Sequence, residues 1–244
     1  MGTLFDERGA GVLRRPDRRV RRVEGADRVD YLHRMLSQDV AGLQIGDARD
    51  ACVLTPKGRL IGLPTVLHVG SRYLLDLDAA TADDVVAALE RTVITEDVTI
   101  SSPEEEIRRL TVVGPRSAEL VATLVDEVPE PGRHVAQGGV RVLRRDLGGT
   151  VAYEVFVTAG AESAGVEALA EAVPLEPVQW DALRVAERVP AWGMELGPDV
   201  MPLEARLDES AISFTKGCYP GQEPVSMAHH RGHPPNLLVR VGLE

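Results

Sequence analysis

The sequence is poor in several residue types that mark particular classes of protein. It holds two cysteines, Cys52 and Cys218, in 244 residues. These are too few for a disulfide framework, so a reducing cytoplasm is the expected location. Aromatic residues make up 4% of the chain, which argues against a surface that stacks single-stranded bases. No apolar run approaches the roughly 20 residues of a membrane-spanning helix, so no membrane association is expected.

Positive charge is also scarce, because the formal net charge is -11 and the isoelectric point is about 5.1. Strong direct binding of nucleic acid is therefore not expected. One basic stretch, RRPDRRVRR at residues 14–22, carries six arginines. It is typical of a solvated edge that discourages strand aggregation. The alternative is an anion site for phosphate, RNA or a polyglutamate tail.

Hydrophobic periodicity predicts alternating strands and helices in two successive units, an α+β arrangement and not a doubly wound parallel sheet. No glycine-rich phosphate loop follows a strand, so a nucleotide fold has no support. Thr81 is the predicted N-cap of one helix, with Asp84 completing a capping box. The predicted helices span about 27–40, 81–89, 115–125, 163–172 and 177–187, and the predicted strands about 51–55, 60–69, 73–77, 98–101, 107–113, 140–144 and 151–157. The sequence predicts an irregular segment over residues 190–236 and a final strand over residues 237–241.

The stretch KGCYPGQE, residues 216–223, places one of the two cysteines in a turn-like setting. Pro and Gly occupy the central positions of a predicted type II turn over residues 219–222. Lys216 is expected to lower the pKa of the Cys218 thiol by favouring the thiolate. An inert loop cysteine is the ordinary alternative, and the residues alone do not decide between them.

Three further groups of polar residues are candidates. In VAYEVFV, Glu154 points away from Tyr153, and its carboxylate suits the N–H groups of an amino-heterocycle such as a pterin; a solvent-facing position is the ordinary alternative, which the pattern favours. Arg184 lies on a predicted helix, where arginine is usually exposed. The H-H-x-x-H run is formed by His229, His230 and His233, but the following prolines argue against a helix, so no metal site is expected.

KGCYPGQE closely resembles the signature of the YgfZ family of folate-binding proteins, relatives of the glycine-cleavage T-protein. DYLHRMLSQDVAGLQIGDARDACVLTPKGRLIG, DLGGTVAYEVFV and WDALRVAERVPAWGMEL resemble further blocks of that family. The resemblance implies a T-protein-like fold of two intertwined α+β lobes around a central cavity. It divides the chain into folate-binding lobes at 1–190, a signature-loop region at 191–236 and, at 237–244, the first strand of a C-terminal β-barrel that is largely absent.

The resemblance also implies the ligand and the site. Tetrahydrofolate or a one-carbon derivative is the expected cofactor, with Glu154, Arg184 and Tyr153 as cofactor-binding residues. Cys218 and Lys216 are the expected reactive pair. The signature loop around them comprises Gly217, Tyr219, Gly221, Gln222 and Glu223.

The resemblance implies two functional hypotheses for this chain, and two more are weighed beside them. The first is a folate-binding accessory protein for iron–sulfur cluster assembly or maintenance, with iron–sulfur enzymes or assembly proteins as partners and a link to tRNA modification. The alternative is a one-carbon (aminomethyl) transferase on an unknown amine. True aminomethyltransferases carry an Asp-Asp pair where this chain has Gly62 and Leu63, so glycine cleavage is not expected. A scaffold without folate and a thiol-redox sensor remain open, although Cys52 reads as a buried strand residue.

Overall fold

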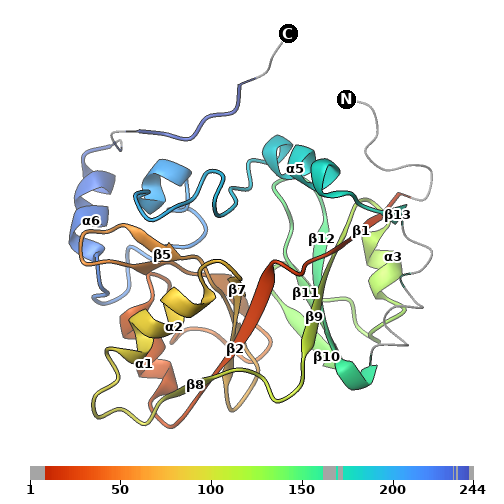
Figure 1. Cartoon of the computed structure of the whole chain (residues 1–244), viewed down its shortest axis with the longest axis horizontal. Helices are drawn as coiled ribbons and strands as arrows, with labels where there is room; N and C mark the ends of the chain where they lie inside the picture. The colour runs from red at the N-terminus through yellow and green to blue at the C-terminus, as the bar shows by residue number, and fades with distance from the viewer. Residues whose placement is uncertain (1–8, 162–168, 170–172, 233, 235, 242–244) are drawn as a thin grey trace. The chain divides into compact units, whose positions relative to one another are not determined.

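The computed structural model describes residues 9–161, 169, 173–232, 234 and 236–241 (Figure 1). The chain divides into two compact units that interleave along the sequence. Unit 1 comprises residues 1–16 and 103–189, and unit 2 comprises residues 17–102 and 190–244. The predicted α+β class is confirmed, while the predicted helix at 163–172 lies almost wholly outside the described residues.

Unit 1 is built around a six-stranded sheet in the order β10-β11-β12-β9-β1-β13. Neighbouring strands are antiparallel except for β1 and β13, which run parallel. Its strands are β1 (Gly11–Arg14), β9 (Ile107–Val113), β10 (His134–Gln137), β11 (Val140–Arg144), β12 (Ala152–Thr158) and β13 (Val173–Pro174). Its helices are α3 (Ser117–Val121), α5 (Pro177–Ala186) and the short 3-10 helix η1 (Ala159–Ala161).

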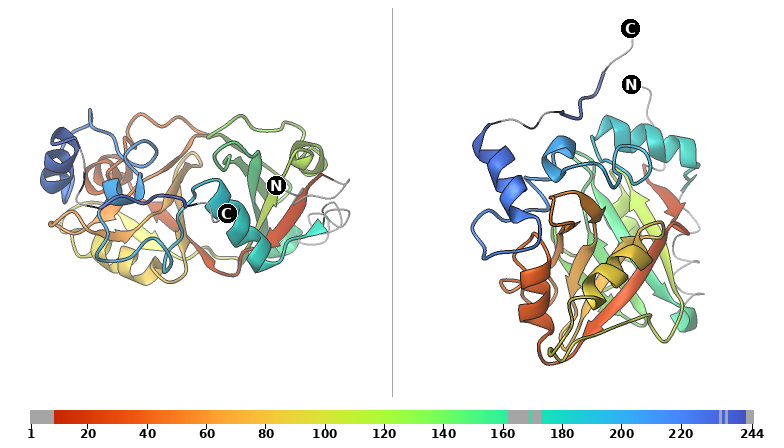
Figure 2. Two further views of the ribbon diagram at one scale, coloured as in Figure 1. Left: turned by 90° about the horizontal axis from the view of Figure 1, so that it is seen from above. Right: turned by 60° about the vertical axis from the view of Figure 1, so that its left-hand side comes forward.

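The two faces of this sheet support different clusters. Val121 of α3 packs with Tyr153 and Val155 of β12 on one face, where alternate residues of the strand are apolar. Leu183 of α5 packs with Ala152 of β12 and Val113 of β9 on the other face. Figure 2 shows α3 and α5 on different sides of the strands of unit 1. The period of two therefore assigns Glu154 to the α5 face, together with Ala152.

Unit 2 contains a five-stranded sheet in the order β3-β6-β7-β2-β8 and the small hairpin β4-β5. Helix α2 packs its buried Val85 and Leu89 into a cluster that includes Leu75 and Leu77 of β7. Its strands are β2 (Arg18–Glu24), β3 (Ala48–Asp50), β4 (Val53–Leu54), β5 (Leu60–Gly62), β6 (Thr65–His68), β7 (Tyr73–Asp78) and β8 (Thr99–Ser101). Its helices are α1 (Arg28–Met35), α2 (Ala82–Glu90), α6 (Gln222–His230) and the 3-10 helix η2 (Pro202–Ala205).

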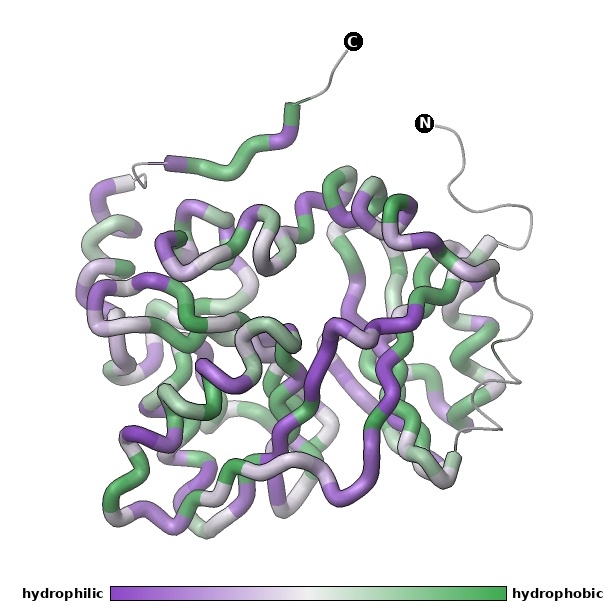
Figure 3. The backbone as a smooth tube through the Cα atoms, viewed as in Figure 1, coloured by the Kyte–Doolittle hydropathy of each residue, from purple (hydrophilic) through white to green (hydrophobic). Residues whose placement is uncertain are grey.

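The arginine-rich stretch differs from its prediction. It spans the end of β1 and most of β2, and both are inner strands of their sheets, so it is not a solvated edge. The trace of β2 is mainly hydrophilic (Figure 3). Buried Val20 and Val23 are too few among arginines to reveal a strand by periodicity.

Three predictions of local structure in unit 2 need correction. Thr81 is the N-cap of α2 but makes no side-chain cap, because its hydroxyl donates back to the Asp78 carbonyl at 3.2 Å. The region predicted as irregular holds α6, which includes His229 and His230. No strand forms over residues 237–241; the Leu238 amide instead donates to the Glu204 carbonyl at 2.7 Å.

Candidate functional site

Glu154 is the centre of a buried polar group in unit 1. It lies in the middle of β12, directly opposite Thr111 of β9, and is 4% exposed. The solvent-facing position favoured by the sequence pattern is therefore wrong. Alternation correctly predicts which face of the strand the carboxylate occupies, but the covering of that face comes from distant parts of the chain.

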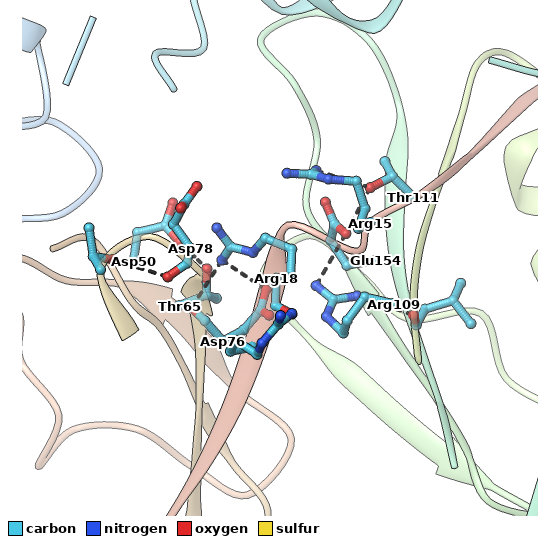
Figure 4. A network of polar contacts seen from close by, with 12 residues as sticks. Arg15, Arg18, Asp50, Thr65, Asp76, Asp78, Arg109, Thr111 and Glu154 are labelled. Carbon is cyan, nitrogen blue, oxygen red and sulfur yellow. Dashed lines mark hydrogen bonds and ion pairs between the residues drawn. The ribbon is translucent and has the colours of Figure 1, made fainter. Parts of the chain in front are cut away.

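Of the residues that the structure describes, two donate to Glu154 through their side chains, and both reach the same oxygen (Figure 4). The Thr111 hydroxyl donates to Oε2 at 2.9 Å, and the Arg109 guanidinium donates to Oε2 at 3.3 Å. Arg15 donates to the Thr111 oxygen at 3.4 Å. Since a guanidinium has no acceptor, the Thr111 proton must point to the carboxylate. We call these four residues the Glu154 site.

Arg109 is a residue that the sequence reasoning missed. It shares its face of β9 with Thr111 by the period of two, because strand neighbours alternate. Its guanidinium lies 3.6 Å from the ring centroid of Phe156 and also donates to the Val155 carbonyl at 3.1 Å. Arginine and threonine at alternate positions of a strand, on one face, are the signal that could have identified it.

The other two predicted cofactor-binding residues are placed differently. Arg184 is 3% exposed and not on the surface; its Nε donates to Asp181 at 2.7 Å, and α5 carries it on the side of Leu183. Tyr153 is 1% exposed within the cluster on the α3 face, where burial raises its pKa. The structure thus does not bring Tyr153 and Glu154 together, because adjacent strand residues face opposite ways.

Unit 2 carries a second polar group, which we call the acid pair: Asp50 and Asp76 with their donors. Thr65 of β6 lies opposite both Asp50 of β3 and Asp76 of β7. The Thr65 hydroxyl donates to Asp50 at 2.6 Å, and Arg18 pairs with Asp76 at 3.0 Å (Figure 4). Sequence reasoning missed this group as well, because no single strand carries more than one member at a recognisable spacing.

Gly62 and Leu63 lie at the end of β5 and just after it. A Cβ at Gly62 would lie 2.4 Å from the Val85 side chain of α2. The position therefore packs a helix directly against the strand backbone, and a carboxylate there would collide with it.

The signature loop follows the prediction closely at its turn. Gly221 has φ 79° and ψ 7°, and the Gln222 amide donates to the Tyr219 carbonyl at 3.2 Å, which is the geometry of a type II turn. A Cβ at Gly221 would lie 2.5 Å from the Thr55 carbonyl oxygen, so glycine is required for both conformation and space. Cys218, just before the turn, is exposed, whereas Cys52 is buried and its pKa is raised by burial to about 12.

Lys216 holds the loop to the end of α1. Its ammonium donates to the carbonyls of His33 and Leu36, the latter at 2.5 Å. Unpaired carbonyls at a helix C-terminus are natural partners for a cation. Burial lowers the Lys216 pKa to about 8, and the charges of Asp39 and Cys218 act in the opposite direction.

The structure also places Tyr219 of the signature loop and two of the three histidines that follow the loop. Tyr219 is 6% exposed, and its hydroxyl has no hydrogen-bond partner among the described residues; burial raises its pKa to about 12. His229 of α6 stacks on Phe214 with ring centroids 3.9 Å apart, and His230 donates to the Ser226 carbonyl at 2.7 Å. His233 lies outside the described residues. No group of three potential metal ligands occurs in the described part of the chain.

Comparison with known proteins assigns the family. The GCVT N-terminal domain family matches residues 18–216. The chain belongs to this family. Its fold matches that of the glycine cleavage system aminomethyltransferase T from Bartonella henselae, with a TM-score of 0.82 at 21% identity, over 92% of this chain and 64% of that one.

Family relatives carry several names. A chloroplastic protein of Arabidopsis thaliana named as a transferase is 30% identical over 84% of this chain and 50% of its own length. The tRNA-modifying protein YgfZ of Vibrio vulnificus is 27% identical over 89% of this chain and 65% of its own. An aminomethyltransferase of Halalkalibacterium halodurans is 27% identical over 91% of this chain and 64% of its own length. The chain thus spans between half and two thirds of these relatives. Within the described ranges, no helix is long and apolar enough to cross a membrane.

Proposed function

We propose that this protein binds tetrahydrofolate or a one-carbon derivative of it at the Glu154 site. The observation that carries the proposal is a buried carboxylate whose two protein donors both reach Oε2. Oε1 accepts no hydrogen bond from the described residues. A carboxylate oxygen that can still accept hydrogen bonds suits the amino and ring N–H groups along one edge of a pterin. Membership of a family that includes aminomethyltransferases supports the same ligand class.

The test is a calorimetric titration of tetrahydrofolate into the wild-type chain and into Glu154→Ala. We expect saturable binding by the wild type and a loss of about 100-fold or more in the variant, because a charged hydrogen-bond acceptor is removed. Glu154→Gln is titrated alongside, since losing a buried carboxylate also lowers stability. Glu119→Ala is the matched control, because Glu119 pairs with Arg116 on the surface of the same unit. Wild-type protein that is folded but binds no folate contradicts the proposal.

The wider role that we propose is that of an accessory protein in iron–sulfur cluster assembly or maintenance, in a reducing cytoplasm, acting on iron–sulfur enzymes or assembly proteins that include one for tRNA modification. The relatives named as the tRNA-modifying protein YgfZ support the link to tRNA modification, and the KGCYPGQE loop supports a YgfZ-type role. The packing of Gly62 against Val85 supports it too, since strand β5 offers no acid for proton transfer. Loss of an iron–sulfur enzyme activity in a strain carrying the milder Glu154→Gln replacement, with normal protein level, is the expected outcome.

In that role Cys218 is the reactive thiol and Lys216 its neighbour. Cys218 is exposed at the turn, whereas Cys52 is buried. We expect iodoacetamide to modify Cys218 in the folded protein and to reach Cys52 only after unfolding, because an inaccessible thiol with a raised pKa is inert. Slower modification of Cys218 in Lys216→Ala would support the pairing; equal rates in both proteins would contradict it.

A further inference from the structure

We infer that Arg109 and Thr111 are positioning residues: they hold Oε2 of Glu154 and so leave Oε1 to face the N–H edge of the ligand. The inference rests on the proposed function and deepens it. It concerns which atom of the carboxylate meets the ligand, and it makes predictions that a purely structural role for Arg109 does not.

The strand ladder positions both donors. Thr111 is the residue opposite Glu154 across the β9–β12 pair, and Arg109 is opposite Phe156, two residues further along. Side chains on the same face at these positions lie within reach of one another. Because the register is continuous from Ala152 to Thr158, the backbone positions that carry the donors and the carboxylate cannot shift relative to one another without breaking the sheet.

The contact with Arg109 is made to one oxygen only. Arginine often binds a carboxylate through two parallel hydrogen bonds, which would occupy both oxygens. Here the guanidinium is turned by its other partners: it donates to the Val155 carbonyl at 3.1 Å and lies over the Phe156 ring at 3.6 Å. Its side chain is 1% exposed, so water does not compete for these contacts.

Two donors on Oε2 use up the lone pairs of that oxygen, whereas Oε1 accepts nothing from the described residues. The carboxylate is therefore asymmetric before any ligand arrives. A ligand that offers N–H groups gains a strong charged hydrogen bond at Oε1 without displacing a protein contact. The same arrangement disfavours a ligand that presents an acceptor at this edge.

The replacement Glu154→Gln tests this asymmetry, because it would place a donor where the wild type presents an acceptor to the ligand. Arg109 has only donors, so the amide must turn its oxygen towards Arg109 and Thr111 and its NH2 towards the ligand. The amide would then oppose the 2-amino group of the pterin. We expect tetrahydrofolate to bind Glu154→Gln about 100-fold more weakly than the wild type. In an Arg109→Met, Thr111→Val background the amide can rotate, and the same replacement costs about tenfold or less.

A second measurement needs no change at Arg109, whose replacement could impair folding. Tetrahydrofolate is compared with its analogue that lacks the 2-amino group, in wild type and in Glu154→Gln. We expect loss of the amino group to weaken binding to the wild type about tenfold, and to leave binding to Glu154→Gln unchanged or stronger. If the amide rotates freely, the analogue binds more weakly to both proteins, and the inference is overturned.

The outcomes separate this inference from the proposed function. A folded wild type that binds no tetrahydrofolate overturns the proposed function, and the inference about the ligand-facing oxygen falls with it. Binding by the wild type, combined with an equal cost of Glu154→Gln in both backgrounds, overturns the inference alone.

Discussion

Units 1 and 2 each carry a threonine, an arginine and acidic side chains across the strands of a sheet, yet they combine them differently (Figure 4). In unit 1 the threonine and the arginine converge on one carboxylate, that of Glu154. In unit 2 they serve separate carboxylates, since Thr65 donates to Asp50 and Arg18 to Asp76. The pair in unit 1 is also more deeply buried, with side chains 1% and 5% exposed against 14% and 4%.

The difference shows what a preorganised carboxylate requires. Convergence of two donors on one oxygen leaves the second oxygen of Glu154 available, whereas in unit 2 the threonine and the arginine each contact a different acid. Deep burial makes the first arrangement costly to disrupt, because an uncompensated charge cannot be solvated by water. The site in unit 1 is accordingly the better candidate for ligand recognition.

Removal of the two ion-paired carboxylates tests this contrast most strongly. We expect Glu154→Ala to lower the free energy of unfolding by about 3–5 kcal/mol, because it takes the carboxylate from a guanidinium with almost no access to water. Asp76→Ala should cost about 1–2 kcal/mol, since Arg18 is partly solvated. Urea unfolding with unchanged m-values measures both. Equal losses would show that burial does not distinguish the two units.

A new carboxylate at Gly62 tests whether unit 2 can accept the acid of true aminomethyltransferases. We expect Gly62→Asp to lower the unfolding free energy by about 1–3 kcal/mol through overpacking against Val85. Gly197→Asp is the matched control, because no atom lies within 4 Å of a Cβ there. Similar stability of both variants would mean that packing does not exclude an acid from β5.

Thr111 of unit 1 and Thr65 of unit 2 can be compared by the same replacement, and smaller losses of stability are expected than for the carboxylates. Thr111→Val removes a hydroxyl that links Arg15 to Glu154, and we expect a loss of about 2 kcal/mol. Thr65→Val removes one hydrogen bond to Asp50, which is only partly buried, and should cost about 1 kcal/mol. Thermal unfolding of both variants gives the order, and a larger loss at Thr65 would reverse the comparison.

The smallest effect is expected from Lys216 of unit 2 and depends on pH. Its pKa is about 8 in the folded chain against an ordinary 10.5, so between these values the unfolded state binds more protons. The free energy of unfolding should therefore rise as the pH rises through this window, by about 1 kcal/mol after allowance for solvent screening. Lys216→Met should abolish the rise, and Lys57→Met, at an exposed turn, should retain it. A rise that persists without Lys216 would assign it to another group.

Much of the local structure could be predicted from the sequence, because short-range rules control it. The period of two correctly separated Tyr153 from Glu154, and the Pro-Gly pair predicted the turn at Gly221 that the backbone adopts. The burial of Cys52 was predicted as well. Predictions failed where charge masked periodicity, as in β2, and at residues 237–241, where apolar alternation did not lead to a paired strand.

By itself the sequence determined the α+β class, the family through its signature loop, and the face of β12 on which Glu154 lies. Only the tertiary structure decided that this face is covered and that Arg109 and Thr111 converge on one oxygen. The physical reason is distance along the chain. Thr111 and Glu154 are 43 residues apart, and their contact exists only because β9 and β12 pair in one register. No rule that operates within a single strand can specify that partner.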